Sequence, residues 1–429
     1  MAQPEPFPLP SPPNDGITSL LYLSTPPPSS SSSLSSSSLL ASTSWDGALR
    51  LHDVPDDGCA GGARLAVSRS MGSGPLLSVA ASSRTSVGEA SAATRMMVFA
   101  GGCDGTIKRL DVDASIVDVV GRHSHRRNGG GAPSSSSSSF SSPPAASCLS
   151  SIDDAVIASA GWDKRFHVWD ARVRTSSRDG DDGDVGGGGI EPVASADLPG
   201  KAYGMDVSRD GRLVVVATSG RRNCFLDLRK MPSRSSSKET TMVVASSPED
   251  GGGEDDDVDD EDGDKIGIEA KILMDRESSL KFQTRCVKFF GMPNSIGIAV
   301  GSIEGRVAIE YMDDMGIESN GGKKYAFKCH RVNDTIYPVN AIAFHPIYGT
   351  FATGGADGTV VTWDAANKKK LSAITKCPTS VSALSFNADG TRLAIASSYT
   401  FEEGERDHPR EEIYIRDVLE SEVRPKSKK

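Results

Sequence analysis

The clearest pattern of apolar and polar positions in this chain lies in residues 339–367, VNAIAFHPIYGTFATGGADGTVVTWDAAN. Three runs alternate between apolar and polar residues or are rich in β-branched ones, and Gly, Pro or Asp residues separate them. Such runs predict short strands. Asp357-Gly358, between two of them, predicts a tight hairpin turn in which both central residues take positive φ. The stretch therefore predicts three antiparallel strands, the last ending at Trp363-Asp364.

The same unit recurs along the chain, giving seven copies at residues 16–54, 75–113, 148–172, 202–229, 286–313, 339–367 and 381–418. In four copies the turn aspartate stands seven residues before the aspartate that ends the third strand: Asp46 and Asp53, Asp104 and Asp111, Asp163 and Asp170, Asp357 and Asp364. This fixed offset gives these copies the same turn and the same length of third strand. Such radial repetition is typical of a β-propeller.

A propeller blade needs a fourth strand, and segments that can supply it follow several copies: Glu191–Leu198, Lys271–Glu277, Tyr325–His330 and Lys369–Ile374. Little chain is left after Val418, so we expect Pro4–Pro12 to close the last blade. Its prolines suit an outer strand, because proline has no N–H to donate within a sheet. We therefore predict an all-β fold, a seven-bladed β-propeller that takes up residues 1–429 as one domain.

Low-complexity tracts interrupt the copies at residues 24–38, 82–94, 128–142, 175–189 and 233–264. Tracts rich in Ser, Gly and Asp cannot bury enough apolar surface to offset the entropy of ordering them. We expect them to be disordered insertions in loops between strands. The fold can tolerate them, because the entropic cost of closing a loop grows only logarithmically with its length.

Composition changes this picture little. The net charge is −10, but eleven of the acidic residues lie in residues 249–264, and the rest of the chain is close to neutral. Without a basic footprint, no direct binding to nucleic acid is expected. The seven cysteines are an odd number and contain no Cys-x-x-Cys, which favours a reducing compartment. We expect neither a secretory signal nor a membrane-spanning helix, and hence no membrane partner.

Two tryptophans depart from the repeat. Trp45 and Trp162 stand just before the turn aspartate in the first and third copies, where other copies hold small residues such as Cys103 and Ala356. Large aromatic side chains on a surface turn suit a binding face, to which they contribute contact area. The alternative is that each indole packs on a neighbouring blade rim.

Two arginines form a second candidate pair in the fifth copy. Arg285 opens its first strand, and Arg306 follows its turn. An antiparallel meander can bring both to one rim, where two guanidinium groups can hold carboxylates or a phosphate in bidentate fashion. The alternative is an ordinary salt bridge, for instance with Glu304 or Glu310.

No catalytic or metal-binding motif stands out. The turn aspartates are expected to accept hydrogen bonds from turn amides. His123-Ser124-His125 has no Cys or carboxylate partner at ligand spacing, so no metal is expected. The chain contains neither a phosphate-binding Gly-x-x-x-x-Gly-Lys-Ser/Thr loop nor a Gly-x-Ser-x-Gly elbow at a strand-to-helix turn. We therefore expect a protein that is not an enzyme and has no cofactor.

The repeats with their terminal Trp-Asp resemble the WD-repeat β-propeller family. A closer resemblance, to the spindle-checkpoint propellers of the budding-uninhibited-by-benzimidazole (Bub-three) type, rests on RESSLKFQTRC, GSIEGRVAIE, KKYAFKCHR, IYPVNAIAF and AIASSY. A sister branch, the RNA-export propeller that binds a nucleoporin, shares GSIEGRVAI, FKCHR and ASSY. FHPIYGT also leans toward that branch, whereas RESSLKFQTRC, KKYAF and IYPVN favour the checkpoint branch.

The resemblance implies a non-enzymatic adaptor of the mitotic spindle assembly checkpoint. Trp45 and Trp162 match family positions that contact a short acidic motif of checkpoint kinases or kinase-like proteins. Arg285 and Arg306 match residues that contact an acidic or phosphothreonine-containing motif of a kinetochore scaffold. The resemblance further implies a monomeric propeller in hetero-complexes, located in the nucleus and at the mitotic kinetochore and also in the cytoplasm.

Two other functions stay open at this point. One is an mRNA-export or nuclear-pore adaptor, as in the sister branch. The other is a substrate receptor of a cullin-type ubiquitin ligase, since Trp169-Asp170-Ala171-Arg172 matches the Trp-Asp-x-Arg pattern of such receptors. This pattern is short and also arises in WD repeats by chance.

Overall fold

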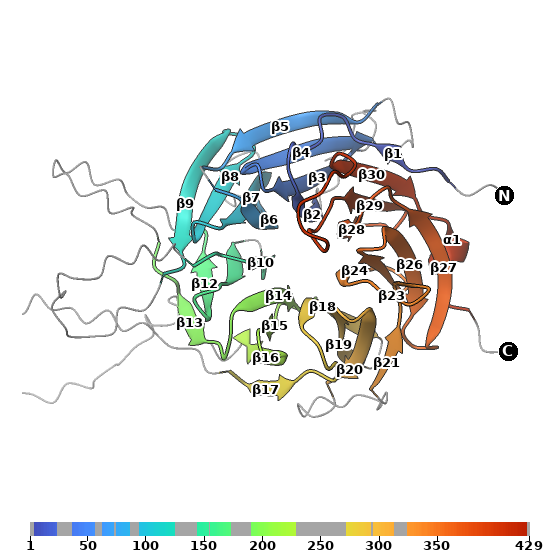
Figure 1. Ribbon diagram of the computed structural model, residues 1–429. Coiled ribbons are helices and arrows are strands. Elements are labelled where there is room, and N and C mark those ends of the chain that lie inside the picture. Colours follow the sequence, from blue (N-terminus) through green and yellow to red (C-terminus); the bar gives the residue numbers. More distant parts are fainter. Residues whose placement is uncertain are drawn as a thin grey trace, which may run out of the picture.

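Seven four-stranded antiparallel sheets are arranged as blades around a central axis in a computed structural model of the chain (Figure 1). The predicted all-β, seven-bladed propeller is therefore confirmed. The structure describes residues 4–23, 37–55, 62–72, 74–85, 94–124, 144–153, 155–172, 190–228, 272–292, 295–312 and 324–426.

The strands of each blade follow one another from the axis outward. Blade 1 consists of β2 (Ile17–Leu23), β3 (Ser37–Ser44), β4 (Ala48–Pro55) and β5 (Arg64–Ser70). Blade 2 consists of β6 (Leu76–Thr85), β7 (Thr94–Gly102), β8 (Thr106–Asp111) and β9 (Ile116–Arg122). Blade 3 consists of β10 (Cys148–Ser151), β11 (Val156–Ala160), β12 (Arg165–Asp170) and β13 (Ala194–Asp197). Blade 4 consists of β14 (Ala202–Val207), β15 (Leu213–Thr218), β16 (Arg222–Asp227) and β17 (Met274–Glu277).

Blade 5 consists of β18 (Thr284–Met292), β19 (Ser295–Ser302), β20 (Arg306–Tyr311) and β21 (Tyr325–Lys328). A ribbon of β22 (Arg331–Val332) and β23 (Thr335–Ile336) leads to blade 6, which consists of β24 (Val339–Phe344), β25 (Phe351–Gly355), β26 (Thr359–Asp364) and β27 (Lys369–Lys376). Blade 7 consists of β28 (Val381–Phe386), β29 (Arg392–Ser397), β30 (Glu412–Asp417) and β1 (Phe7–Pro8). A short helix, α1 (Glu420–Val423), follows, and no helix among these residues is long and apolar enough to cross a membrane.

The N-terminal segment closes the ring, as the sequence predicts. β1 pairs with β30, Phe7 opposite Ile415 and Pro8 opposite Tyr414, and the Leu9 amide donates to the Ile413 carbonyl at 2.8 Å. Leu9 is only 3% exposed, within a core shared by blades 7 and 1. The prolines are tolerated because β1 is an outer strand, whose far edge needs no hydrogen-bond donors. Blade 7 is thus built from both ends of the propeller.

The predicted fourth strands are also confirmed, with β13, β17, β21 and β27 in the expected segments. The hydrophobic cores lie mainly between neighbouring blades, where apolar residues of one sheet pack on the next, as between blades 3 and 4. The alternating apolar residues noted in the sequence are therefore buried between neighbouring blades as well as within them, and their burial stabilises both kinds of contact.

The turn geometry differs in one respect from the prediction. Gly358 has a φ of 75°, but Asp357 does not take positive φ. The aspartate instead accepts a hydrogen bond from the Thr359 amide at 3.1 Å, and a carboxylate of this kind fixes the turn without a second left-handed residue. The equivalent carboxylates of Asp46, Asp104 and Asp163 accept the same bond, which confirms their predicted structural role.

Two predicted insertions extend too far. β3 begins at Ser37, β6 runs to Thr85 and β7 begins at Thr94, so parts of 24–38 and 82–94 are strands. Composition was misleading there because the ladder depends on backbone hydrogen bonds, which Ser and Thr make as well as apolar residues do. The rest of these two tracts, and 128–142, 175–189 and 233–264, lie outside the described residues.

Candidate peptide-binding face

One hydrogen bond recurs in every blade and defines equivalent positions around the ring. A backbone N–H in the turn between the second and third strands donates to a carbonyl just before the first strand of the same blade. The donors are Trp45, Cys103, Trp162, Ser219, Ile303, Ala356 and Ser398. We call the face that carries these turns the top face; it is the face turned to the viewer in Figure 1. Trp45 and Trp162 therefore occupy the same position in blades 1 and 3.

Both indoles remain substantially exposed on the top face. Trp45 is 51% and Trp162 36% exposed. Trp45 lies beside Gly16, where an added Cβ would come within 3.3 Å of the indole Cδ1, and the Lys201 ammonium lies 5.8 Å from the Trp162 ring centroid. An exposed indole costs free energy unless something covers it, which is the condition that makes such residues binding hot spots. Their role as peptide-binding residues stays a prediction.

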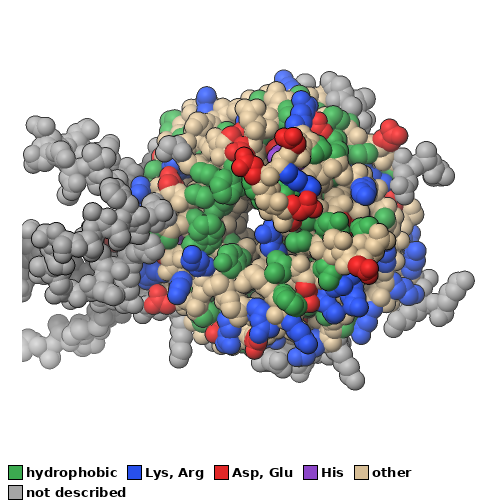
Figure 2. Space-filling model, in the orientation of Figure 1, with side chains coloured by type: hydrophobic (Ala, Val, Ile, Leu, Met, Phe, Trp, Pro, Cys, Tyr) green, Lys and Arg blue, Asp and Glu red, His purple; other side chains and the backbone are tan. Residues whose placement is uncertain are grey.

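Further apolar side chains, which sequence reasoning missed, lie on the same face. Tyr203, Phe282 and Ile303 are exposed, and Phe401 in the β29–β30 connection is 63% exposed. Figure 2 shows hydrophobic side chains gathered around the central hollow. Ile303 could have been found, because it stands at the position of Trp45 in the fifth copy. Clustered exposed apolar residues of this kind are typical of a protein-binding surface.

The hollow itself is a cavity of about 570 Å³ lined mainly by the first strands of blades 1–5. Its charged wall includes Asp206, which lies 2.8 Å from the Lys288 ammonium and also accepts the Phe289 amide. Burial alone would lower the pKa of Lys288, but the Asp206 carboxylate outweighs it and raises that pKa. The pair is therefore held charged and mutually satisfied, and so is poorly suited to proton transfer near neutral pH.

Arg285 and Arg306 lie at the same, top end of blade 5. Thr284, next to Arg285, pairs with Ser302, and Ser302 pairs with Arg306, so one strand separates the two arginines. The Arg285 guanidinium donates through Nη2 to Asn340 Oδ1 at 3.0 Å. Arg306 Nε lies 3.3 Å from a Glu304 carboxylate oxygen, which is the salt bridge that the sequence offered as the alternative. The structure thus places both arginines at the top end of blade 5, Arg285 lining the central hollow and Arg306 on the third strand, without joining them. Phosphate binding there stays a prediction.

Exposed lysines add positive charge to blades 5 and 6. Lys328 on β21 lies opposite Arg306 on β20, whereas Lys324, Lys369 and Lys370 lie toward the other end of the outer strands. Figure 2 shows Lys and Arg side chains gathered over blades 5 and 6. No local sequence pattern indicates this surface, because its residues are far apart in the sequence and lie on the outer strands of two different blades. Such a surface attracts anionic ligands.

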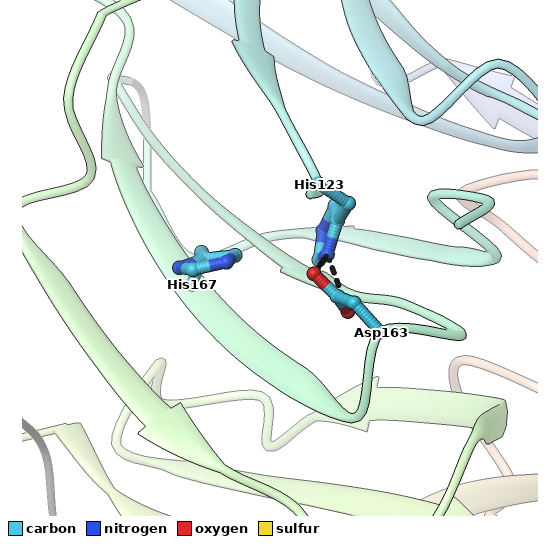
Figure 3. Close-up of side chains that lie close together, drawn as sticks. All are labelled: His123, Asp163 and His167. Atoms are coloured by element: carbon cyan, nitrogen blue, oxygen red, sulfur yellow. Dashed lines mark hydrogen bonds and ion pairs between the residues drawn. The ribbon is translucent and has the colours of Figure 1, made fainter. Parts of the chain in front are cut away.

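A cluster of His123, Asp163 and His167 has ligand atoms within 4.8 Å of one another and raises the question of a metal (Figure 3). His123 leads from blade 2 into blade 3, and Asp163 is the turn aspartate of blade 3. The His123 Nδ1–H donates to the Asp163 carboxylate at 2.9 Å, and Nε2 bonds to the Ser159 hydroxyl at 2.8 Å. The Trp169 indole N–H donates to the same hydroxyl at 2.8 Å.

The same arrangement recurs elsewhere, and this repetition settles its role. In blade 6, His330 bonds to Asp357 through Nδ1 and to Thr353 through Nε2, and Trp363 donates to Thr353. Among the described residues, this second arrangement includes only one histidine. Each arrangement, which we call a His–Asp clasp, joins the segment entering a blade to that blade's turn and third strand. Hydrogen bonding accounts for both copies.

The surroundings of His167 agree with this interpretation. Its Nδ1 bonds to the Ser195 hydroxyl at 2.7 Å, and burial, with the charges of His123 and Arg165, holds its pKa well below the usual range. A metal would have to displace the bonds that His123 already makes through both nitrogens. The residues present therefore fit a structural clasp and not a metal centre. The position of Trp169 and Trp363, one residue before the terminal aspartate, was the available signal in the sequence.

Comparison with known proteins agrees with the fold and specifies the family. The WD40 family model, described as WD domain, G-beta repeat, matches residues 321–364. The chain is 34% identical to the mitotic checkpoint protein bub3 of Dictyostelium discoideum over 330 residues, which cover 76% of this chain and 77% of that protein. It is 42% identical to the mitotic checkpoint protein BUB3.1 of Arabidopsis thaliana over 278 residues, 63% of this chain and 65% of that protein.

The sister branch is also related. The chain is 28% identical to the poly(A)+ RNA export protein of Schizosaccharomyces pombe over 401 residues, 91% of this chain and 87% of that protein. Protein RAE1 of Arabidopsis thaliana is 42% identical over 154 residues, which cover only 35% of this chain and 42% of that protein. The checkpoint relative BUB3.1 reaches the same identity over a longer stretch, which agrees with the segments that favour the checkpoint branch. On this similarity, and with the seven-bladed fold, the chain belongs to the Bub3 family of mitotic checkpoint proteins.

Proposed function

We propose that the protein is a non-enzymatic adaptor of the mitotic spindle assembly checkpoint, and that its top face binds a short motif of checkpoint kinases or kinase-like proteins. The observation that carries this proposal is the pair of exposed indoles, Trp45 and Trp162, at equivalent turns of blades 1 and 3. Tyr203 and Phe282 add apolar surface on the same face. Aromatic anchors of this kind supply binding free energy, while contacts to the backbone and the charges of the peptide fix the register in which the motif binds.

The second part of the proposal concerns the rim of blade 5. Arg285 and Arg306, with Lys328 beside them, would hold a phosphorylated or acidic motif of a kinetochore scaffold. A phosphate carries nearly two negative charges and three acceptor oxygens, so it can compete with the single carboxylate of Glu304 for Arg306. The adaptor would then bring kinases to the scaffold as a monomer in hetero-complexes. It would act in the nucleus and at the kinetochore in mitosis and would also occur in the cytoplasm.

Pull-down of partners from mitotic extract tests both parts. The Trp45→Ala variant should lose checkpoint kinases, and the Arg306→Ala variant should lose the kinetochore scaffold. Because Trp45 is proposed as a hot spot, its replacement should weaken the Kd for the kinase motif about 30-fold. The melting temperature should hardly change, because the indole and the Arg306 side chain are partly exposed. Ile347→Ala removes an exposed apolar side chain from a turn on the opposite face and serves as the control. Unchanged partner recovery in both variants would refute the assignment of the sites.

An RNA-export role is the second candidate, favoured by the export relative that covers 91% of this chain. The ubiquitin-ligase alternative gains no such support: Trp169 is buried in a His–Asp clasp, and Arg172 pairs with its neighbour Asp170 at 2.6 Å. Affinity purification from mitotic cells separates the three functions. Recovery of checkpoint kinases supports the proposal, whereas a nucleoporin or a ligase adaptor in their place would replace it.

A further inference from the structure

A second cavity, of about 610 Å³, opens at the top rim between blades 7 and 1. Three parts of the chain that are distant in sequence line it: the segment after β1, the outer part of blade 1 and the β29–β30 connection. Figure 1 shows that connection reaching from blade 7 toward blade 1. Pro12, Pro13 and Leu65 give the cavity an apolar wall. We call it the junction cavity.

The positive charges of the junction cavity are already neutralised. Arg50 makes a bidentate ion pair with Asp46, whose nearer contact is 2.7 Å, and Arg410 pairs with Glu412 at 3.0 Å. His408 directs Nδ1 to the Pro409 carbonyl at 2.8 Å. None of these groups therefore offers a free cation to an incoming anion.

The negative charges of the cavity are not neutralised in the same way. Glu411 is only 6% exposed; one of its oxygens, Oε1, lies 3.5 Å from His408 Nδ1, but Oε2 has no hydrogen-bond partner among the residues that the structure describes. Asp15, which also lines the cavity, accepts only the adjacent Gly16 amide among the bonds found in this part of the chain. A buried carboxylate oxygen without a partner is costly, and a charged donor would remove that cost.

The pKa of Glu411 agrees with this description. Burial raises this pKa most, whereas hydrogen bonds from the Ser398 side chain and the Tyr399 backbone and the charge of His408 lower it; the charge of Asp15 raises it further by a smaller amount. The two carboxylates thus act on each other electrostatically. A cation placed between them would be stabilised by both.

We propose that the junction cavity is a subsite for a basic side chain, lysine or arginine, of a polypeptide partner. The charged end would meet Glu411 and Asp15, while the aliphatic stem would pack on Pro12, Pro13 and Leu65. Mixed surroundings of this kind, an apolar wall with an acidic end, match these two side chains better than a small inorganic cation.

The geometry also indicates why the donor belongs to a polypeptide. The Asn14 amide donates to Asp46, and the Trp45 amide donates to the Gly16 carbonyl, so the cavity directly adjoins the turn that carries the first indole. A segment lying over Trp45 therefore passes the mouth of the cavity. This step rests on the proposed function, whereas the preference for a cation does not.

Disulfide exchange on the full-length chain tests the preference without any partner. In a Ser68→Cys variant, an exposed residue that lines the cavity becomes a thiol. The Ser68→Cys protein is equilibrated with equal amounts of cystamine, bis(2-hydroxyethyl) disulfide and dithiodipropionate. The introduced thiolate attacks a reagent sulfur, forms a mixed disulfide and releases one reagent thiol, so no net oxidation occurs. Peptide mapping of residue 68 then distinguishes its adducts from those on native cysteines.

The cationic cysteamine adduct should exceed the neutral adduct by about three- to tenfold, and the anionic adduct should be the rarest. Glu411→Gln in the same background should abolish the preference, and Asp15→Asn, at an exposed residue, should reduce it even if Glu411→Gln fails to fold. Glu405→Gln removes an equal charge from an exposed residue of the same connection outside the cavity and should leave it intact.

Equal labelling by the three reagents, or a preference that survives both carboxylate substitutions, would overturn the subsite. Loss of kinase recovery in Trp45→Ala with an intact cation preference would support both proposals independently. Intact recovery in Trp45→Ala together with an intact preference would refute the proposed peptide site while leaving the cation subsite standing.

Discussion

Ser159 offers the sharpest test of the His–Asp clasp. Its hydroxyl is fully buried and holds two partners at 2.8 Å, the His123 ring and the Trp169 indole. The Asp163 carboxylate can only accept, so His123 Nδ1 carries the proton that it donates there, and in the neutral ring Nε2 accepts from the Ser159 hydroxyl. The hydroxyl in turn accepts from the Trp169 indole, which can only donate. The four groups therefore form one directed chain in which each donor has one acceptor.

Ser159→Ala breaks this chain in the middle. It leaves the Trp169 N–H and His123 Nε2 buried without partners, and each orphaned group costs about 1–3 kcal/mol. The free energy of unfolding should fall by about 2–6 kcal/mol in total, a large share of the stability of a typical protein. Thr353→Val, in the second clasp, should show a loss of the same order because it orphans His330 and Trp363.

Ser42→Ala is the matched control. Ser42 stands three residues before Trp45, as Ser159 stands three before Trp162, and it is as deeply buried. Its hydroxyl has no partner among the described residues, because blade 1 carries no clasp. The same substitution should therefore change stability by less than about 0.5 kcal/mol or even raise it.

Urea denaturation followed by circular dichroism measures these differences, with the slope m checked for constancy. A difference of less than about 1 kcal/mol between Ser159→Ala and Ser42→Ala would refute the reasoning, since burial and substitution are the same and only the hydrogen bonds differ.

Three further outcomes follow from the structure. Leu9→Ala, at a residue 3% exposed, should cost about 2–5 kcal/mol in a urea titration; a loss below about 1 kcal/mol would show that the N-terminal segment does not hold the ring closed. Burial would raise the pKa of Asp46, but hydrogen bonds, chiefly from Arg50, lower it to about 2, so its stabilisation is full above pH 4 and lost toward pH 2. Asp46→Asn should accordingly be less stable than the parent at pH 6 and approach it as the pH falls; a constant gap would contradict this. Glu422→Gln removes the charge that pairs with Arg416, which is 0% exposed, and should cost about 3–5 kcal/mol, whereas a neutral effect would show that the pair is dispensable.

The fold could be predicted because its signal is local and repeated. A turn aspartate at a fixed distance from the end of the third strand marks four blades, and the remaining copies keep enough of that frame to be aligned with them. The closing strand was predicted from the lack of chain after Val418. The ends of the insertions were misplaced because strand pairing at Ser37 and Thr85 depends on backbone bonds that composition does not report.

The candidate sites were only partly predictable. Trp45 and Trp162 could be found as departures from a repeat, since the repeat predicts a small residue there. The clasp could not, because His123 and Asp163 meet across 40 residues that include a low-complexity tract. The junction cavity joins Asp15 to Glu411 across nearly the whole chain, and no local pattern indicates such a pair. Sequence periodicity therefore locates positions within a blade, while contacts between blades need the closed ring.

Ring closure has a consequence for folding during synthesis on the ribosome. The Ile17 amide bonds to the Ser398 hydroxyl, 381 residues later, and β1 cannot pair until β30 has been synthesised, which happens later still. Blade 1 must therefore remain without its neighbour on one side, with its apolar flank uncovered, until almost all of the nascent chain has emerged. During that time chaperones have a specific surface to protect, between Leu20 and its future contacts in blade 7. Slow translation anywhere in the later blades would prolong this exposure.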